Sequence, residues 1–320
     1  MPPRRPRPAT DDGPATDFGP ATGTSPTTDG TAQHVAARIL AWYDTAERAL
    51  PWRAPGHGAW GVYVSEVMAQ QTQVARVAEV WPAWMQRWPS PAALAASSPA
   101  EVVRQWGRLG YPRRALWMHA AATAMVLHHG GQVPRDADAL RALPGVGEYT
   151  AAAIRAFAFG ERVAVLDVNV RRVHARAFFG SGHPAPSVTL AERAHHERFL
   201  PADALTAAHL SQAVMEFGAV VCTARAPQCA SCPIADSCAC LRGGSPTAER
   251  RPRKQAVFVG SDRQCRGALM QVLRDAHAAV PASALEGAWT EALQRQRCLD
   301  ALIADGLVKP LAGHRFALPG

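Results

Sequence analysis

The chain has 320 residues, a formal net charge of +8 and a pI of about 9.5. This length allows two or three modest domains with hydrophobic cores. No apolar run is long enough to cross a bilayer, which argues against a membrane protein. The basic balance suits a polyanionic partner such as a nucleic acid, but charge by itself identifies no partner.

The first segment, residues 1–32, is rich in Pro, Thr, Gly and Asp and contains Arg4, Arg5 and Arg7. It lacks the apolar centre that a secretory signal peptide needs. We therefore expect a disordered tail and a soluble protein that stays inside the cell, in the cytoplasm.

Residues 33–240 are rich in alanine and divide into stretches with the hydrophobic period of helices. The alternation typical of strands is nearly absent, so the predicted fold class is mainly α. Turns containing Gly or Pro separate the stretches. The helical stretches are Val35–Tyr43, Trp60–Trp88, Pro99–Trp106, Arg113–His129, Asp136–Leu143, Tyr149–Phe159 and Val170–Phe179.

The C-terminal part begins with a basic linker, residues 241–258, which contains Lys254 and several arginines. Residues 259–320 follow, with three short helical stretches and a candidate hairpin at Val308–Leu318. This order resembles a small winged-helix module. The module is a candidate for DNA binding, for a structural cap or for an interaction surface.

The segment Leu143–Ala151 connects two helical stretches with the sequence Leu-Pro-Gly-Val-Gly-Glu-Tyr-Thr-Ala. Its glycines, Gly145 and Gly147, allow a tight turn and a close approach of the backbone to another surface. The free N–H groups at the start of the next helix would then form a natural phosphate site. An ordinary helix–helix turn with a glycine cap fits the same residues, so this segment alone leaves both interpretations open.

Five of the seven cysteines lie between Cys222 and Cys240. In an intracellular chain, such clustering is more typical of metal binding than of disulfides. Four of them have the spacing C-x6-C-x2-C-x5-C, which can surround one tetrahedral zinc ion or one cubane iron–sulfur cluster. Cys240 falls outside this pattern. The four predicted ligands are Cys222, Cys229, Cys232 and Cys238.

The hairpin and the cysteine spacing together resemble the endonuclease-three superfamily of DNA glycosylases over residues 33–240. Three further stretches narrow the resemblance to the A/G-mismatch-specific adenine glycosylases. These stretches are Leu50-Pro51-Trp52-Arg53, Val64-Ser65-Glu66-Val67-Met68-Ala69-Gln70-Gln71-Thr72 and Leu109-Gly110-Tyr111. Ala69, Pro112 and Val168 depart from the residues usual in that family, and none of the three departures removes a catalytic group.

The resemblance implies a two-lobed helix-hairpin-helix fold. Residues 60–165 would form a helical barrel lobe with the hairpin at 143–151, and residues 33–59 with 166–240 would form a lobe around a [4Fe–4S] cluster. The implied protein is a monomeric base excision repair enzyme that acts at the nucleoid on double-stranded DNA containing a mismatch. The family usually ends in a large Nudix-like domain that checks for 8-oxoguanine, and the chain after the linker is too short for one.

Release of adenine needs a proton for the leaving base and stabilisation of the positive charge that develops on the sugar. Glu66 shares a partly apolar helix face with Val62 and Tyr63, and burial there would raise its pKa. An ordinary solvated helix residue is the alternative. The resemblance implies that Glu66 is the general acid that protonates the adenine ring.

Asp167 follows the apolar stretch Val163–Leu166 and precedes a helical stretch, which is a good N-cap position. The resemblance implies that Asp167 stabilises the oxocarbenium-like sugar, and a capping role is compatible with this. Asn169 matches an asparagine of the same motif and is expected to orient the site.

Tyr149 occupies the position of the lysine nucleophile in the bifunctional members of the superfamily. The chain has lysine only at Lys254 and Lys309, so the amine for a Schiff base is missing from this segment. We therefore expect a monofunctional glycosylase. Tyr149 is expected to hydrogen-bond near Asp167, with a purely core position as the alternative.

A base inside a duplex must be flipped into a pocket before it can react. The resemblance assigns the adenine pocket to Trp52, Arg53 and Gln212, with core packing as an equal alternative for Trp52. No Gly or Pro interrupts the helical pattern at Gln71 and Thr72, so the period alone predicts a helix through them, whereas the resemblance implies a turn. The predicted DNA contacts are Gln71, Thr72, Tyr111, Gly145, Val146 and Gly147.

Three other functions remain as alternatives. A thymine glycosylase that acts on T:G mismatches also accommodates Tyr149, although the stretch Leu50–Arg53 and Gln212 favour adenine. A bifunctional endonuclease is disfavoured by the missing lysine. A non-catalytic iron–sulfur DNA-binding protein is disfavoured because both Glu66 and Asp167 are present.

Overall fold

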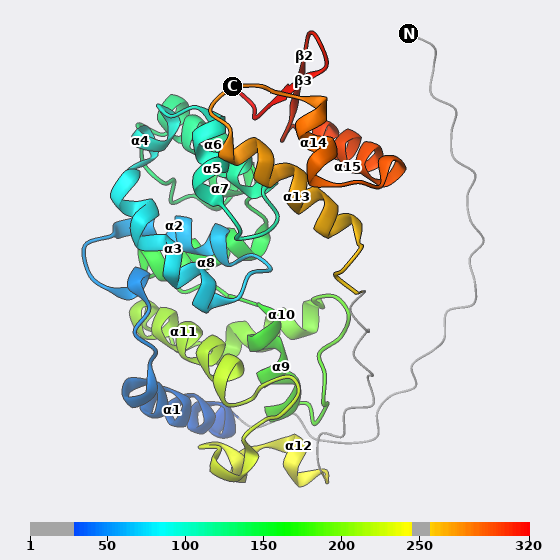
Figure 1. Cartoon of the computed structure of the whole chain (residues 1–320). Coiled ribbons are helices and arrows are strands. Elements are labelled where there is room, and N and C mark those ends of the chain that lie inside the picture. Colours follow the sequence, from blue (N-terminus) through cyan, green and yellow to red (C-terminus); the bar gives the residue numbers. More distant parts are fainter. Residues whose placement is uncertain (1–28, 245–256) are drawn as a thin grey trace, which may run out of the picture.

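The structure is a computed structural model that describes residues 29–244 and 257–320. In this part of the chain, two helical lobes lie one above the other and a small C-terminal module packs on one of them (Figure 1). The predicted mainly α class is confirmed. Most of the predicted tail and of the linker, at residues 1–28 and 245–256, lies outside the described residues. The first helix begins at Asp29, so the predicted tail boundary at residue 32 is too late.

The barrel lobe is built by the helices α2 to α8 around a core of tryptophans. Trp81, Trp84, Trp88 and Trp106 are each at most 2% exposed, and aromatic rings of this size contribute much of the apolar area that a core buries. Ser98 and Glu101 form a reciprocal capping box that starts α5. The helices are α2 (Gly58–Ala69), α3 (Val74–Arg87), α4 (Pro91–Ala95), α5 (Pro99–Trp106), α6 (Arg113–His128), α7 (Ala137–Ala142) and α8 (Glu148–Phe159).

The single helix that the hydrophobic period predicts over Trp60–Trp88 is wrong at its centre. Helix α2 ends at Ala69, and α3 begins only at Val74. Between them Gln71 has a φ of 54°, a left-handed conformation that costs free energy for a residue with a side chain. The turn therefore depends on tertiary contacts, which hydrophobic periodicity does not register.

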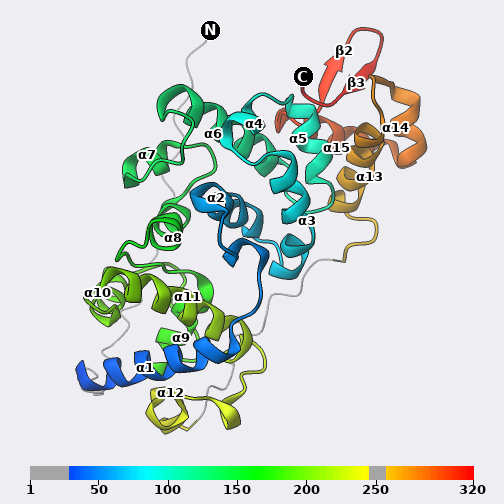
Figure 2. The same ribbon diagram turned by 90° about the vertical axis from the view of Figure 1, so that its left-hand side faces the viewer.

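The second lobe combines the N-terminal helix with the chain after residue 160. Val35, Ile39 and Tyr43 of α1 are fully buried in one core with Phe217 of α11, as the predicted pairing of residues 33–59 with 166–240 requires. Figure 2 shows α1 beside α9 and α12. The elements are α1 (Asp29–Ala46), α9 (Val168–Ala177), α10 (Leu190–Phe199), α11 (Ala204–Val220), α12 (Ala239–Arg242) and the short 3-10 helices η2 (Cys229–Ser231) and η3 (Ala235–Ser237).

Two segments connect the lobes and bring functional residues to the boundary between them. The first contains the 3-10 helix η1 (Pro51–Arg53), which packs against α2 and α3. The second runs from the end of α8, at Gly160, to the start of α9 at Val168. Trp52, Arg53 and Asp167 therefore lie where the two lobes meet.

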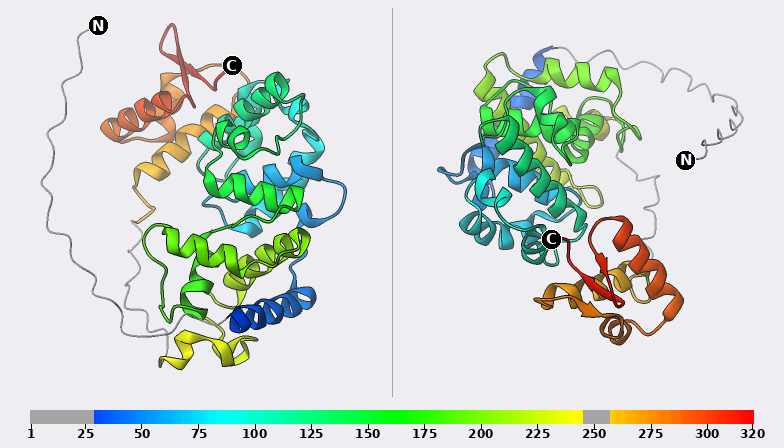
Figure 3. Two further views of the ribbon diagram at one scale, coloured as in Figure 1. Left: turned by 180° about the vertical axis from the view of Figure 1, so that it is seen from behind. Right: turned by 90° about the horizontal axis from the view of Figure 1, so that it is seen from above.

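The C-terminal module has the element order of a winged helix, as predicted. Its three strands form an antiparallel sheet in the order β1-β3-β2, with Phe316 opposite both Val280 and Pro310. Helix α13 packs on α5, so that the module shares the hydrophobic core of the barrel lobe, and Figure 3 shows the module projecting from one side of that lobe. The elements are α13 (Asp262–Asp275), β1 (Val280–Pro281), α14 (Ala282–Ala288), α15 (Ala292–Ala304), β2 (Lys309–Leu311) and β3 (Arg315–Ala317).

No helix among the described residues is both long enough and apolar enough to span a membrane.

Candidate active site

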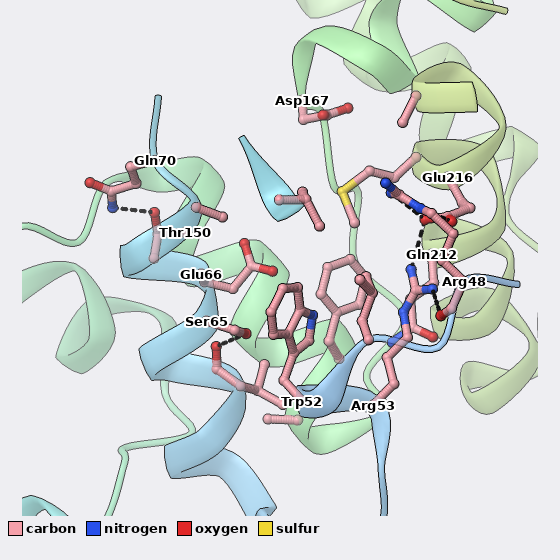
Figure 4. Close-up of a pocket in the computed structure, with 18 of the residues that line it drawn as sticks. Arg48, Trp52, Arg53, Ser65, Glu66, Gln70, Thr150, Asp167, Gln212 and Glu216 are labelled. Atoms are coloured by element: carbon pink, nitrogen blue, oxygen red, sulfur yellow. Dashed lines mark hydrogen bonds and ion pairs between the residues drawn. The ribbon is translucent and has the colours of Figure 1, made fainter. Parts of the chain in front are cut away.

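A cavity of about 1080 Å³ opens between the two lobes. It is large enough to hold a nucleobase and its sugar. Figure 4 shows the Glu66 side chain pointing into it from α2, with Asp167 on the opposite lobe. The predicted residues that line the cavity are Trp52, Arg53, Glu66, Gln71, Thr72, Gly145, Gly147, Tyr149, Asp167, Asn169 and Gln212. Of the predicted DNA contacts, Tyr111 and Val146 lie outside this lining.

Glu66 has the surroundings of a carboxyl group that keeps its proton. Its pKa is raised to about 7, mainly by burial and also by the charge of nearby Asp167. A hydrogen bond from Tyr149 and the charge of Arg53 act in the opposite direction but do not cancel the effect of burial. Near neutral pH a large fraction of Glu66 is therefore protonated and able to donate a proton into the cavity.

Tyr149 donates its hydroxyl hydrogen bond to Glu66 Oε2, at 3.1 Å. The partner is Glu66 because α8 packs against α2, and the charge of Asp167 acts on both residues, so this hydrogen bond lies near Asp167 as expected. Burial raises the pKa of Tyr149 well above its usual value, and the charges of Glu66 and Asp167 add to this effect. The phenol thus stays neutral and acts as a hydrogen-bond donor rather than as a nucleophile.

Asp167 is the N-cap of α9, and the predicted capping role is confirmed. Its Oδ1 accepts a hydrogen bond from the Val170 N–H at 2.6 Å, and its Oδ2 accepts one from Asn169 Nδ2 at 2.7 Å. Burial raises the pKa of Asp167, whereas these hydrogen bonds and the positive charge of Arg172 lower it. The cap fixes both carboxylate oxygens, and each of these partners favours the ionised form.

A chain of hydrogen bonds continues from Asp167 to the cysteine loop. Asn169 Oδ1 accepts from Arg172 Nη2 at 2.8 Å, and Arg172 Nε donates to the Cys222 carbonyl at 2.8 Å. Arg172 also donates to the carbonyl of Gly218. A Cβ at Gly218 would lie 2.8 Å from Asn169 Cβ, so this glycine permits α11 to approach the start of α9.

Two charged residues that sequence reasoning missed hold Arg53 in place. Glu216 is 1% exposed and accepts hydrogen bonds from Arg48 Nη2 at 2.8 Å and from Arg53 Nη2 at 3.0 Å. The surrounding arginines lower the pKa of Glu216 despite its burial. Glu216 lies one helical turn after Gln212 on α11, and this i,i+4 spacing toward a predicted pocket residue is the signal that could have identified it.

The position of Trp52 is compatible with both interpretations that the sequence left open. It lines the cavity and also packs edge-on against the buried Trp81, with ring centroids 6.2 Å apart. Gln212 is half-buried on the same cavity wall as Glu216. One indole face and several polar side chains are therefore available to a flipped base.

The hairpin between α7 and α8 has one glycine with a steric requirement. Gly145 has a φ of 79°, and a Cβ at this position would lie 3.0 Å from Trp117 Cβ. Gln70 Nε2 donates to the Gly145 carbonyl at 3.2 Å and thereby ties the hairpin to α2. Gly147 is the N-cap of α8 with a φ of −96° and open space around it, so contacts within the chain require a glycine only at Gly145.

A buried arginine that the sequence analysis did not single out joins the turn at Gln71 and Thr72 to the turn at Tyr111. Tyr111 has a φ of 47° and is 58% exposed. Arg114 is 3% exposed and donates to Thr72 Oγ1 at 2.8 Å and to the Gly110 carbonyl at 3.0 Å. The left-handed conformations at Gln71 and Tyr111 are thus supported by one shared hydrogen-bond donor.

The cysteine loop closes around a small pocket in the second lobe. Cys222, Cys229, Cys232 and Cys238 all line it, together with Cys240, which lies outside the sequence pattern. Arg176 Nη1 donates to Cys222 Sγ at 3.4 Å, a contact that suits a thiolate ligand. Four thiols around one pocket are a donor set that fits an iron–sulfur cluster.

Comparison with protein families agrees with both parts of this geometry. Residues 64–196 match the HhH-GPD superfamily of base excision DNA repair proteins. Residues 222–238 match the iron–sulfur binding domain of endonuclease III. The predicted iron–sulfur cofactor is thereby confirmed, and the four cysteines of the pattern are the residues available to hold it.

Solved structures support the fold. A thermostable thymine-DNA glycosylase is similar with a TM-score of 0.61 and 25% identity, over 68% of this chain and 99% of that one. Endonuclease III in a non-covalent complex with DNA is similar with a TM-score of 0.58 and 22% identity, over 68% of this chain and 97% of that one. At these identities the similarity is one of fold.

Curated relatives identify the family. The adenine DNA glycosylase of Mycobacterium tuberculosis is 47% identical over 297 residues, which cover 90% of this chain and 95% of that protein. The human adenine DNA glycosylase is 40% identical over 62% of this chain but only 38% of its own length. A thymine/uracil-DNA glycosylase of Pyrobaculum aerophilum is 35% identical over 62% of this chain. The chain therefore belongs to the adenine DNA glycosylases, enzymes of base excision repair.

Proposed function

We propose that this adenine DNA glycosylase is monofunctional and removes adenine paired with 8-oxoguanine or guanine. The observation that carries the proposal is the pair of carboxyl groups in one cavity, with a pKa of about 7 for Glu66 and a hydrogen-bonded N-cap at Asp167. No lysine among the described residues lines this cavity, so hydrolysis without Schiff-base chemistry is the reaction that its groups support.

Glu66 is the general acid in this proposal. It donates its proton to a ring nitrogen of the flipped adenine, which makes the base a better leaving group. The Tyr149 hydroxyl, 3.1 Å from Glu66 Oε2, orients the carboxyl group. Its hydrogen bond also stabilises the carboxylate that remains after the proton has been transferred.

Asp167 stabilises the sugar as the glycosidic bond breaks. Its ionised carboxylate faces the positive charge that develops on the oxocarbenium-like ring. Asn169 and the Val170 N–H hold this carboxylate rigidly, which keeps the charge in position without reorganisation. Water then completes hydrolysis, and the DNA backbone remains intact.

The adenine pocket is proposed to consist of Trp52, Arg53 and Gln212, with Arg53 held in position by Glu216. Trp52 offers its indole face for stacking. The base opposite adenine would lie beside Gln71, Thr72 and Tyr111. These residues lie on the two turns that Arg114 joins and take no part in the proposed bond breaking. The hairpin Gly145-Val146-Gly147 with the start of α8 would bind backbone phosphate.

The cluster would be held by Cys222, Cys229, Cys232 and Cys238, and it would act as a cross-link within the second lobe. The chemistry of base release itself uses the side chains described above. The two hydrophobic cores support the division into a barrel lobe and an iron–sulfur lobe. We further propose that the enzyme works as a monomer in the cytoplasm, at the nucleoid.

Base release from defined duplexes tests this function. The duplexes contain A:8-oxoguanine, A:G, T:G or 8-oxoguanine:C, and each reaction is analysed with and without alkali. We expect free adenine from the first two and strand cleavage only after alkali. Thymine release would instead favour a T:G enzyme, and cleavage without alkali would contradict the monofunctional assignment. Glu66→Gln is the inactive control for contaminating glycosylases.

A further inference from the structure

Four arginines without ion pairs lie where the C-terminal module meets the barrel lobe. Every salt bridge among the described residues involves other basic side chains. The proposed adenine pocket uses none of the four. Arg108 and Arg274 repel one another, and the charge of Asp275 offsets this only at Arg274. An excess of positive charge of this kind is typical of a site for a polyanion. The four residues are Arg76, Arg104, Arg108 and Arg274.

Reciprocal hydrogen bonds fix two of these arginines across the junction between α5 and α13. Arg104 Nη2 donates to the Ala276 carbonyl at 3.0 Å, and Arg274 Nε donates to the Val103 carbonyl at 3.3 Å. Figure 2 shows the two helices side by side. These bonds use only part of each guanidinium fork. Arg104 Nε is buried, so the remaining donors that a ligand could reach are those of Arg274 and the terminal nitrogens of Arg104.

The other two arginines extend this surface toward the predicted DNA contacts Thr72 and Tyr111. Arg76, in the first turn of α3, donates to the Arg108 carbonyl. The Arg108 guanidinium is exposed and has no hydrogen bond or ion pair within the described chain. It lies close enough to Arg274 to lower the pKa of that residue, although burial is the larger cause.

This surface lies beside the predicted contacts with the opposite base. Arg108 precedes Leu109-Gly110-Tyr111 directly, and Arg76 follows Thr72 closely in sequence. Thr72 Oγ1 donates to the Leu109 carbonyl at 3.1 Å, which joins the two turns. The arginines therefore continue outward from the place where the base opposite adenine is expected.

An ion-paired contact fixes the module next to this surface. Asp305, at the end of α15, pairs with Arg113 of α6 at 3.3 Å and also with Arg266 of α13 at 2.5 Å. One carboxylate thus pairs with two arginines, which leaves a net positive charge where the module is fastened.

We propose that Arg76, Arg108 and Arg274 bind phosphates of the DNA strand that carries the base opposite adenine. The C-terminal module thereby extends the DNA-binding face of the enzyme. Guanidinium groups suit this ligand because their planar forks bind phosphate oxygens in pairs. The basic residues Arg250, Arg251, Arg253 and Lys254 directly precede the module in sequence and have the same sign of charge. The inference rests on the proposed position of the opposite base at Tyr111.

Charge-removing variants test the surface. Arg108→Gln is the cleanest change, because its side chain has no partner to lose among residues 29–244 and 257–320. Arg274→Gln is compared with Arg274→Lys, which keeps the charge. Arg297→Gln is the matched control in the module, since Arg297 already pairs with Asp262 at 2.7 Å. Binding is measured over a range of salt concentrations on a duplex with 8-oxoguanine opposite a non-excisable adenine analogue.

Each lost phosphate contact is expected to lower the slope of log affinity against log salt by about 0.9 and to weaken binding roughly 3- to 10-fold at low salt. Arg108→Gln and Arg274→Gln should show this loss, while Arg274→Lys and Arg297→Gln should retain the parent slope. The single-turnover rate of adenine release at saturating enzyme should be unchanged in all four variants. An unchanged salt slope for both Gln variants would overturn the proposal.

Neutral methylphosphonate linkages identify the strand. Placed beside 8-oxoguanine, they should abolish the difference in affinity between the parent and Arg108→Gln. Placed in the adenine strand, they should leave that difference intact, and the reverse result would overturn the strand assignment. Adenine release from the ordinary duplex is measured in parallel, so that failure of the proposed function is seen separately from failure of this surface.

Discussion

At the scale of single residues, Glu66 and Asp167 face one cavity with different partners. Glu66 is buried and receives one hydroxyl hydrogen bond. Asp167 receives a backbone N–H and an amide N–H and lies near the charge of Arg172. Surroundings of the first kind favour a protonated acid, and hydrogen bonds of the second kind favour an anion. Base release requires one carboxyl group in each of these states.

Replacing Asp167 with Asn separates its capping role from its charge. Asparagine caps helices about as well as aspartate, so we expect little change in the melting temperature. Loss of the negative charge should lower the single-turnover rate of adenine release by roughly 100-fold or more. Calorimetry and quenched-flow assays on the same preparation check both expectations. A variant that melts much earlier, with a proportionate loss of rate, would indicate that the role is structural.

Replacing Tyr149 with Phe should change the pH dependence of the reaction. The tyrosine hydrogen bond lowers the pKa of Glu66, so its removal raises that pKa, and the decline of activity on the alkaline side should move to higher pH. The rate at the plateau should fall as well, because the acid is less well oriented. Single-turnover rates from pH 5 to 9 provide the measurement, and a shift to lower pH would contradict this role of Tyr149.

At the scale of elements, the hairpin between α7 and α8 offers a matched pair of glycines. Gly145→Ala places a Cβ against Trp117 at a positive φ, whereas Gly147→Ala meets open space at an ordinary φ. We expect Gly145→Ala to distort the hairpin and weaken DNA binding roughly 10-fold, and Gly147→Ala to have a smaller effect. Fluorescence anisotropy with a duplex measures both affinities. Equal losses would show that the positive φ of Gly145 has no special importance.

Local chemistry explains which elements could be predicted from the sequence. Asp167 was predictable as a cap because an N-cap depends on residues within one helical turn. The cluster loop was predictable because its four cysteines lie close together in the sequence. The turn at Gln71 was not predictable from hydrophobic period, since buried Arg114 supports it from another helix. The contact between Arg48 and Glu216 joins residues 168 positions apart, and no local pattern indicates such a pair.

At the scale of the whole molecule, the site exists only because two lobes meet. Glu66 and Tyr149 come from the barrel lobe, whereas Asp167 and Glu216 come from the lobe with the cysteine loop. Arg172 connects that loop to the Asp167 side of the site through Asn169. The structural state of the cysteine loop should therefore influence the position of Asp167, the residue proposed to stabilise the sugar.

Loss of a cluster ligand should therefore affect the whole second lobe. Cys229→Ser is expected to lower the iron content and the broad visible absorption of the purified protein, and to lower its melting temperature. Cys298→Ser, in the C-terminal module, should retain both the iron and the colour. Iron and zinc analysis with absorption spectroscopy checks this prediction. A colourless parent protein with one zinc per chain would contradict the iron–sulfur assignment.

The most direct test of acid catalysis by Glu66 is the pH dependence of adenine release from an A:8-oxoguanine duplex under single-turnover conditions. The pKa of about 7 for Glu66 means that the acid is protonated below pH 7 and loses its proton above it. The rate should therefore decline about tenfold for each pH unit well above 7, and Glu66→Gln should be nearly inactive throughout. A rate that stays constant from pH 6 to 9, or an active Glu66→Gln variant, would contradict the account.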